Sequence, residues 1–426
     1  MHMAVDFSLL PPEETLRIDP PSRLVWTVAF FVIAIACVFG VLLIWPKDMP
    51  THTWKFWTSL VLFPLGIPAV IVLRRYSFYD GRKLDVELPN EAARDFNERV
   101  FTAASIPMAL LGAAHRFSDD AKTNNADAIR RGEIILVPQE PIAADNEPVK
   151  SRWLVVPGMR TTAGTPADDC DRRRRVTAWL FEQLLDDLLP CIQPLDAQLP
   201  VTIHLNIDNG FTYQENVQLW MKHWHARQLK PADIEAESSA NLMALDAWLD
   251  KALEGLELHV KLFISIQLYP LLAGTPPDGT AEAGVAVMLA PESVAQRYET
   301  RHIANVHRPV QGLIAQPTDV LSHAMRWAGA KAKYITGRWQ TGIDMAQTGA
   351  LGEPARKLDL TAHPTDLDLT VGFAGIAAPW LALSCAASSL TDEANTQIVV
   401  VGHEKHIQCT VLKSTSDEPT SGSSRA

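Results

Sequence analysis

An uncharged apolar run near the start of the chain, Leu24–Trp45, sets the first requirement on the fold, because it reads LVWTVAFFVIAIACVFGVLLIW. A helix of its 22 residues spans a hydrocarbon core of about 30 Å, at about 1.5 Å per residue. A second uncharged run, Phe56–Leu73, is interrupted by Pro64 and Pro68, which membrane helices tolerate. The sequence therefore predicts an N-terminal anchor, residues 1–83, with transmembrane helices at 24–45 and 56–73.

The flanking charges predict how this anchor is oriented. The segment before the first run holds four acidic residues and two arginines, which is not a basic n-region, and no small-residue cleavage site follows the run, so we expect a retained anchor and not a signal peptide. Basic residues gather after the second run, at Arg74, Arg75, Arg82 and Lys83. The positive-inside rule then places the following domain in the cytoplasm; in a bacterial cell, this would make the anchor an inner-membrane one. If only the first run spans the bilayer, the domain lies on the opposite side.

The composition is that of a globular chain and excludes some classes of function. Of the 426 residues, 47% are apolar and 20% charged, which excludes disorder as the dominant state. The net charge is −11, and residues 84–426 alone carry −13, which argues against a nucleic-acid partner. The five cysteines are scattered and odd in number, so they form neither a disulfide framework nor a zinc site.

Apolar periodicity in residues 84–412 alternates between the period of strands and that of helices. Strand-like segments are 133–137, 152–156, 201–207, 258–269, 284–289, 398–401 and 406–412. Helix-like segments are 176–189, 213–228, 241–253, 320–331 and 380–390. This order predicts a mixed α/β fold with a central sheet. We expect a first half at 84–292, a second half at 293–412 and a disordered tail at 413–426.

Two pairs of histidines are candidates for a metal or catalytic site. His223 and His225 are two residues apart on a predicted helix, where their side chains face apart, so they are poor joint ligands. His403 and His406 flank a predicted β-turn, where solvated side chains are expected, although a hairpin tip can hold a catalytic histidine. We therefore assign no metal ligand and no cofactor.

Cys170 and the basic cluster Arg172–Arg175 are candidates for a reactive thiol site. Cys170 precedes a predicted helix, and a helix start beside four arginines stabilises a thiolate nucleophile. The alternative is a loop cysteine beside a solvated basic run. The cluster itself suits anionic lipid or an acidic partner, and a solvated loop or helix end is the other interpretation. Cys385 lies in a small apolar helix and is expected to be a core cysteine.

No local catalytic signature is present in the sequence. It has no Gly-x-Ser-x-Gly elbow, which disfavours an ordinary serine esterase. A Walker A loop, a Gly-x-Gly-x-x-Gly motif and a His-Glu-x-x-His motif are also missing. We assign no catalytic residue.

The C-terminal segment resembles thiolase-like, ketoacyl-synthase-type domains. Gly372–Pro379 (GFAGIAAP) opens a small-residue helix, and two strands follow it. Ala283–Leu289 resembles the Gly/Ala-rich strand that closes the first half of such domains. The resemblance implies one fold of two pseudo-repeated halves. Those enzymes need a cysteine on a helix elbow and two histidines in glycine-rich settings, and His307 and His403 here lack such settings, so the resemblance implies an inactive domain.

The chain as a whole, from about residue 90 to 412, resembles the bacterial type VI lipase adaptor protein family. The segments that carry the resemblance are Trp153–Gly158, His302–Pro309 and the C-terminal helix and hairpin. The resemblance implies a non-catalytic adaptor that binds a lipase effector and helps load it onto the type VI secretion spike protein. Trp220 and Trp224 are candidate binding anchors if exposed, and core residues otherwise.

Two other functions stay open at this point. One is a membrane-anchored thiolase-like enzyme, acyl-transferring or hydrolytic, that uses Cys170 or one of His403 and His406. The other is a structural protein of the cell envelope that self-associates. The distance between Cys170 and the nearest histidine discriminates the first from an adaptor.

Overall fold

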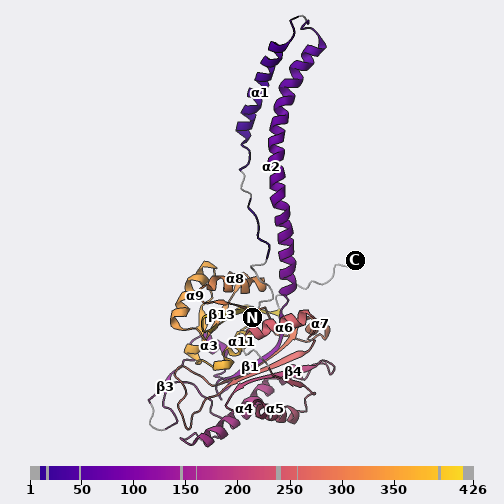
Figure 1. Ribbon diagram of the computed structural model, residues 1–426. Helices are drawn as coiled ribbons and strands as arrows, with labels where there is room; N and C mark the ends of the chain where they lie inside the picture. Colours follow the sequence, from indigo (N-terminus) through magenta and orange to yellow (C-terminus); the bar gives the residue numbers. More distant parts are fainter. Residues whose placement is uncertain are drawn as a thin grey trace. The chain divides into compact units, whose positions relative to one another are not determined.

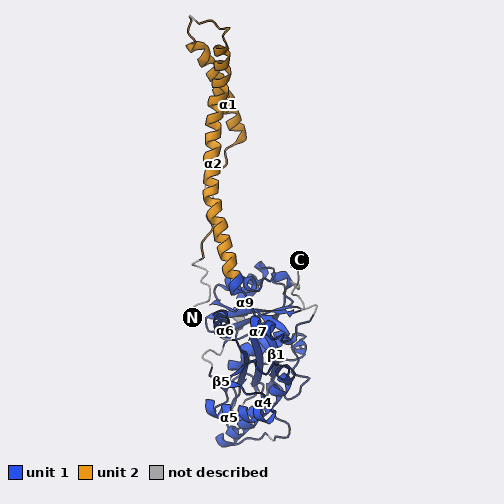
Figure 2. Cartoon of the chain, turned by 90° about the vertical axis from the view of Figure 1, so that its right-hand side faces the viewer, with its two compact units in different colours: residues 1–5, 102–426 blue, residues 6–101 orange. Residues whose placement is uncertain are grey.

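The computed structural model describes residues 10–15, 19–47, 49–143, 147–159, 161–236, 241–256, 258–391 and 395–415. The chain divides into two compact units, the smaller of residues 6–101 and the larger containing Thr102–Ala426 (Figure 2). Residue 83, where the sequence placed the end of the anchor, falls inside a helix that runs on to Ala104.

The smaller unit contains two helices that are long and apolar enough to cross a membrane, α1 (Arg23–Ile44) and α2 (Trp54–Ala104). They run side by side (Figure 1). The ring of Trp45 packs edge-on against that of Phe56, with 5.0 Å between centroids, where the chain turns from one helix to the other. Further along α2, the side chain of Asn90 hydrogen-bonds the backbone of Glu14 through both its oxygen and its nitrogen. The two apolar runs therefore form the helical hairpin that the sequence predicted.

In the larger unit, two groups of five strands have the same order. The first group is β1 (Met108–Arg116), β4 (Val201–Asp208), β5 (Asp233–Glu235), β6 (Val260–Gln267) and β7 (Ala283–Pro291). The second is β8 (Ala304–Val306), β10 (Gly337–Thr341), β11 (Pro364–Asp366), β12 (Thr396–His403) and β13 (His406–Ser414). Numbered by their sequence within each group, both follow the order 3-2-4-5-1.

The directions of the strands also repeat. In each group the fifth strand, β7 or β13, is antiparallel to the four others. The two groups join where β1 pairs antiparallel with β8, and β9 (Val310–Leu313) adds to β13. A separate two-stranded sheet pairs β2 (Pro138–Gln139) with β3 (Val149–Lys150). The duplication confirms the expected fold class, a mixed α/β domain of two pseudo-repeated halves of the thiolase-like type.

Helices cover both halves (Figure 1). Those of the first half are α3 (Ala126–Arg130), α4 (Pro166–Ile192), α5 (Tyr213–Ala226), α6 (Met243–Leu253) and α7 (Glu292–Arg297). Those of the second are α8 (Pro317–Trp327), α9 (Met345–Lys357), α10 (Leu367–Thr370) and α11 (Ala378–Ser388), with 3-10 turns η2 (Ala332–Tyr334) and η3 (Gly375–Ala377). Helices α4, α5 and α7 pack on one face of the first half, and α8 packs on the second half.

The central core lies between the two halves, where α6 and α11 meet. Along the chain, each of these helices comes after the third strand and before the fourth strand of its own half, so the two helices are equivalent in the duplication. The buried indoles of Trp248 on α6 and Trp380 on α11 stack with 6.0 Å between centroids, and the ring of Phe263 lies 4.2 Å from that of Trp380. Ten of the eleven residues of α11 are buried, which explains why the helix is built almost entirely of apolar and small side chains.

Two expected strands do not form. Residues 133–137 have no strand structure, and in 152–156 only Arg152 makes an isolated bridge, to Ala281. The backbone of Leu154 is satisfied by side chains instead, because its N–H donates to Glu282 (2.9 Å) and its carbonyl accepts from Arg172 (3.1 Å). A buried apolar segment therefore needs no neighbouring strand when charged side chains supply its hydrogen bonds.

The limits of two other segments, α4 and β13, differ from the prediction. Helix α4 begins ten residues before the expected start at 176, because Thr165 and Asp168 form a capping box there, and it continues through Pro190. The last strand, β13, reaches Ser414, so the first residues of the predicted tail are ordered. The rest of that tail, residues 416–426, lies outside the described residues.

Candidate functional site

The centre of the larger unit holds a cysteine, a histidine and a serine in contact. The thiol of Cys385 on α11 lies 3.9 Å from Nε2 of His115 on β1. The other ring nitrogen, Nδ1, lies 2.9 Å from Oγ of Ser384. A nucleophile, a base and a group that orients the base are arranged in this way in many thiol enzymes. The geometry alone would therefore permit thiol chemistry.

The environment of this triad opposes thiol chemistry. Burial raises the pKa of the Cys385 thiol, and it lowers the pKa of His115 to about 4. Both shifts keep the proton on sulfur and the imidazole neutral, because neither charged form is stabilised there. Cys385 and Ser384 are fully buried, and the ring of Phe117 stacks on His115. We conclude that this triad is a satisfied core cluster in the structure as it stands, and that Cys385 is the core cysteine the sequence predicted.

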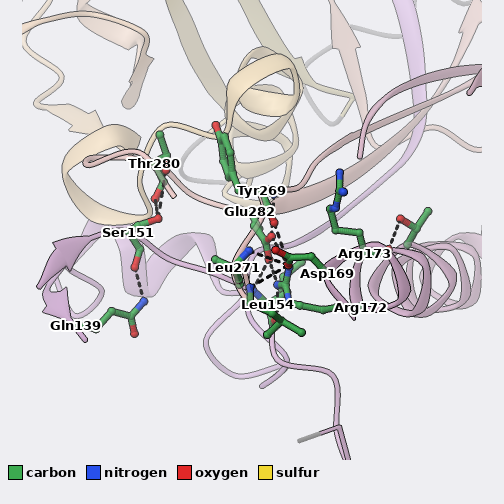
Figure 3. Close-up of polar contacts among 12 residues, drawn as sticks. Gln139, Ser151, Leu154, Asp169, Arg172, Arg173, Tyr269, Leu271, Thr280 and Glu282 are labelled. Atoms are coloured by element: carbon green, nitrogen blue, oxygen red, sulfur yellow. Dashed lines mark hydrogen bonds and ion pairs between the residues drawn. The ribbon is translucent and has the colours of Figure 1, made fainter. Parts of the chain in front are cut away.

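A second buried network ties two loops to helix α4 (Figure 3). The guanidinium of Arg172 forms an ion pair with Glu282 at 2.5 Å, and each side chain is 1% exposed. The carboxylate of Glu282 also accepts the backbone N–H groups of Leu154 and Tyr269, both at 2.9 Å. Every oxygen of the carboxylate is thus used, as a buried charge requires.

Asp169, next to Arg172 on α4, holds the second of these loops. Its carboxylate accepts three successive backbone N–H groups, those of Leu271, Leu272 and Ala273, at 2.9, 3.0 and 2.9 Å. Together, the carboxylate and the guanidinium position the chain around residues 154 and 271 against α4. The network supports the fold, and Arg172 therefore belongs to the core, contrary to the expectation of a solvated basic run.

The other arginines of the cluster have different surroundings. Arg173 is partly buried and donates to the carbonyl of Asn209 at 2.7 Å. Arg174 is exposed; its guanidinium lies 5.2 Å from the centre of the Phe211 ring and 3.8 Å from Glu215. A surface groove of about 330 Å³ lies there, lined by Arg174, Phe211, Glu215, Asn216, Gln218 and Leu219. One arginine of the cluster is thus buried and others lie at the surface, a difference that a run of four arginines in the sequence does not indicate.

Cys170 does not meet a histidine. It lies in the second turn of α4 rather than before a helix, and within the described residues it makes no hydrogen bond to an imidazole. The interpretation of Cys170 as a nucleophile with a paired base is therefore wrong for this structure. The thiol that does meet a histidine is Cys385, and nothing in the sequence signals its contact with His115, 270 residues away.

The remaining candidates fall in three places. His223 and His225 lie on α5, where the His223 ring packs edge-on against Phe181. His403 and His406 pair in register across a two-residue turn of β12 and β13, as expected for a hairpin. Among the described residues no group of three His, Cys, Asp or Glu side chains is placed to hold a metal ion. Trp220 and Trp224 are fully buried, so they are core residues and not exposed anchors.

No protein-family model and no curated protein sequence matches this chain. Solved structures similar to it include the ishigamide ketosynthase/chain length factor, at 14% identity and a TM-score of 0.48 over 72% of this chain and 99% of that chain. The ketosynthase from module 6 of the bacillaene synthase of Bacillus subtilis 168 has 12% identity and a TM-score of 0.48, over 73% and 71%. The peroxisomal 3-ketoacyl-CoA thiolase of Saccharomyces cerevisiae has 10% identity and a TM-score of 0.43, over 73% of this chain and 98% of that chain. These likenesses concern the fold alone.

Proposed function

We propose that the chain is a non-catalytic adaptor, anchored in a membrane by α1 and α2, whose larger unit binds another protein. The observation that carries the proposal is the burial of the Cys385–His115 contact. In the part of the chain that the structure describes, this is the one contact between a thiol and an imidazole, and its pKa shifts disfavour a thiolate. A thiol enzyme of this fold needs the opposite arrangement, an accessible and activated cysteine.

The client that we propose is a lipase effector, and the destination is the type VI secretion spike. Both rest on the resemblance of the sequence to type VI lipase adaptor proteins. The basic residues after the second apolar run support a cytoplasmic position of the larger unit, where an effector would meet it before secretion.

The groove beside Arg174 is the surface that we propose for the client. Arg174 is exposed, its guanidinium lies 5.2 Å from the centre of the Phe211 ring, and arginine is one of the residues enriched at the energetic centre of protein interfaces. The cation also stands out in a domain whose net charge is negative, so it favours an acidic segment of the partner. The carboxylate of Glu215 lies 3.8 Å from the guanidinium of Arg174.

The test is an affinity capture with the full chain in detergent, from a lysate of the organism that carries it, read by mass spectrometry. We expect a lipase or a spike protein to be recovered with the wild type. The variant Arg174→Glu should lose that protein, whereas Arg356→Glu, an equal charge change on the exposed surface of α9, should retain it. Recovery of the bait alone would contradict the proposed function. Equal loss of the client in both variants would contradict the groove beside Arg174 as its binding surface.

A second candidate function is thiol-dependent acyl transfer or hydrolysis, and the observation that favours it is the Cys385–His115–Ser384 geometry. That function requires a conformation in which the triad opens to solvent. Turnover of acyl thioesters by the full chain, abolished by Cys385→Ala and unaffected by Cys170→Ala, would establish it in place of the adaptor.

A further inference from the structure

Three lysines from two separate stretches of the second half line one cavity. Lys331 precedes the short turn η2, Lys333 lies within it, and Lys413 lies in β13. The cavity has a volume of about 510 Å³. Its other lining residues are Gly329, Ala330, Tyr334, Thr336, Asn395 and Thr396. A concentration of three ammonium groups is unexpected in this part of the chain, because residues 84–426 carry a net charge of −13, so the cavity calls for a physical explanation.

Among the residues that the structure describes, the lysines have no carboxylate partner. Within the described residues, none of the three forms an ion pair with a carboxylate, and no carboxylate lines the cavity. The ammonium of Lys413 donates to the carbonyl of Ala328 at 3.2 Å, and that of Lys333 lies 4.9 Å from the centre of the Tyr334 ring. Both contacts position a cation without neutralising it.

The wall behind the lysines is held by hydrogen bonds. The hydroxyl of Thr336 donates to the carbonyl of Thr396 at 3.0 Å and accepts from the side-chain amide of Gln397 at 3.2 Å. Gly337, which follows Thr336, leaves room for that amide, because a Cβ there would lie 1.8 Å from Oε1 of Gln397. The cavity therefore has a hydrogen-bonded wall, and three of the residues that line it are lysines.

We propose that this cavity binds the phosphate group of an anionic ligand. Ammonium groups bind phosphate as point charges, and three of them around one recess can share the oxygens of one or two phosphates. The volume of about 510 Å³ leaves room beside one phosphate for the rest of an ester or for a second phosphate. This binding site is independent of the proposed adaptor function and of the groove at Arg174.

Two sources can supply such a ligand, a phospholipid headgroup or a soluble phosphorylated compound. The cavity lies at the end of the sheet where the chain enters the larger unit. Lys413 follows Leu412, which pairs with Val306, and Val306 pairs with Met108 at the start of β1. Residue 108 comes shortly after the end of α2 at Ala104. Because the membrane anchor is this close in the sequence, both sources are tested with the full chain inserted in a membrane.

The experiment measures how fast each lysine is acetylated by a water-soluble ester, with the full chain in nanodiscs and peptides read by mass spectrometry. One arm adds pyrophosphate to phosphatidylcholine nanodiscs. The other replaces part of the phosphatidylcholine with phosphatidic acid and adds no soluble anion. At a probe concentration ten times its Kd, occupancy leaves about one tenth of the sites free, so acetylation of Lys331 and Lys333 should slow about tenfold. Lys357 and Lys405, which lie away from the cavity, serve as internal controls.

The outcomes distinguish the two sources of the ligand, and they also test whether the cavity binds phosphate at all. Protection by pyrophosphate alone assigns a soluble ligand, and protection by phosphatidic acid assigns a headgroup. In either case the double variant Lys331→Gln/Lys333→Gln should abolish protection of Lys413, whereas Lys357→Gln/Lys405→Gln should not. If neither probe protects the three lysines, or if the control lysines are protected equally, the cavity is not a phosphate site.

Discussion

The thiol of Cys385 and the imidazole of His115 lie 3.9 Å apart in the interior of the larger unit, on a helix and a strand that are far apart in the sequence. Proximity of a thiol and an imidazole is often taken as a sign of catalysis. Here burial acts on both groups in the direction that prevents proton transfer from sulfur to nitrogen. The same two residue types would form an ion pair in a solvated cleft, so their surroundings and not their distance decide their chemistry.

Cys385 should resist alkylation in the native protein. A buried, protonated thiol reacts with iodoacetamide at least about tenfold more slowly than an accessible one. We expect Cys170, which is only partly buried on α4, to be labelled first. Mass spectrometry of the tryptic peptides gives both rates in one sample. In urea the two rates should converge, and rapid native labelling of Cys385 would favour the enzyme over the adaptor.

The pKa of His115 predicts a loss of stability in mild acid. Its folded pKa of about 4 lies below its ordinary value of 6.5, so the unfolded chain binds a proton that the folded chain does not. Stability therefore falls as the pH drops from 6.5 towards 4, by about 3 kcal/mol for this group alone. His115→Gln should weaken the pH dependence of the melting temperature, measured on the full chain in detergent.

Two controls belong with that measurement. His225→Gln, an exposed position on α5, should leave the pH dependence as in the wild type. His307, whose pKa burial lowers to about 3, is present in all three proteins and supplies an acid-sensitive background. An unchanged slope in His115→Gln would show that the ring is solvated in the folded protein.

Breaking the Arg172–Glu282 ion pair should be costly. Removing one partner of a fully buried pair leaves an uncompensated charge and typically costs about 3–5 kcal/mol. We therefore expect Arg172→Met to lower the melting temperature of the larger unit strongly. Arg172→Met/Glu282→Leu should recover part of the loss, because both charges are then gone, although the N–H groups of Leu154 and Tyr269 lose their acceptor.

The matched control is the exposed pair of Arg131 and Glu133, whose side chains are 58% and 56% exposed. Arg131→Met should leave the melting temperature unchanged, since exposed ion pairs contribute little. Equal effects of Arg172→Met and Arg131→Met would mean that the network in Figure 3 does not support the fold.

The positive-inside rule predicts that the C-terminus faces the cytoplasm. A reporter enzyme active only in the periplasm and fused after Ala426 should be silent. The same reporter fused after Pro50, between the two apolar helices, should be active if both helices span the bilayer. Activity of the C-terminal fusion would reverse the side of the larger unit and leave α1 as the single span.

Local patterns in the sequence predicted the longer helices and several strands of this fold, but not the strands β1, β8 and β10. An uncharged run of sufficient length predicts α1 whatever surrounds it, and strict alternation over 201–207 predicts β4. The uncharged segment of small and apolar residues around Cys385 predicts a buried helix, and ten of the eleven residues of α11 are buried. The resemblance to thiolase-like domains added the two halves, which the repeated 3-2-4-5-1 order confirms.

What the tertiary structure decided are the relationships between residues distant in sequence. Whether Arg172 is solvated or buried depends on Glu282, which lies 110 positions further along the chain. The strand expected at 152–156 is absent because that same pair supplies the hydrogen bonds of Leu154. Lys413 joins Lys331 and Lys333 only through the pairing of strands. Periodicity reports which face of an element is apolar, whereas charge, burial and chemistry depend on which faces meet, and that is set when the whole chain folds.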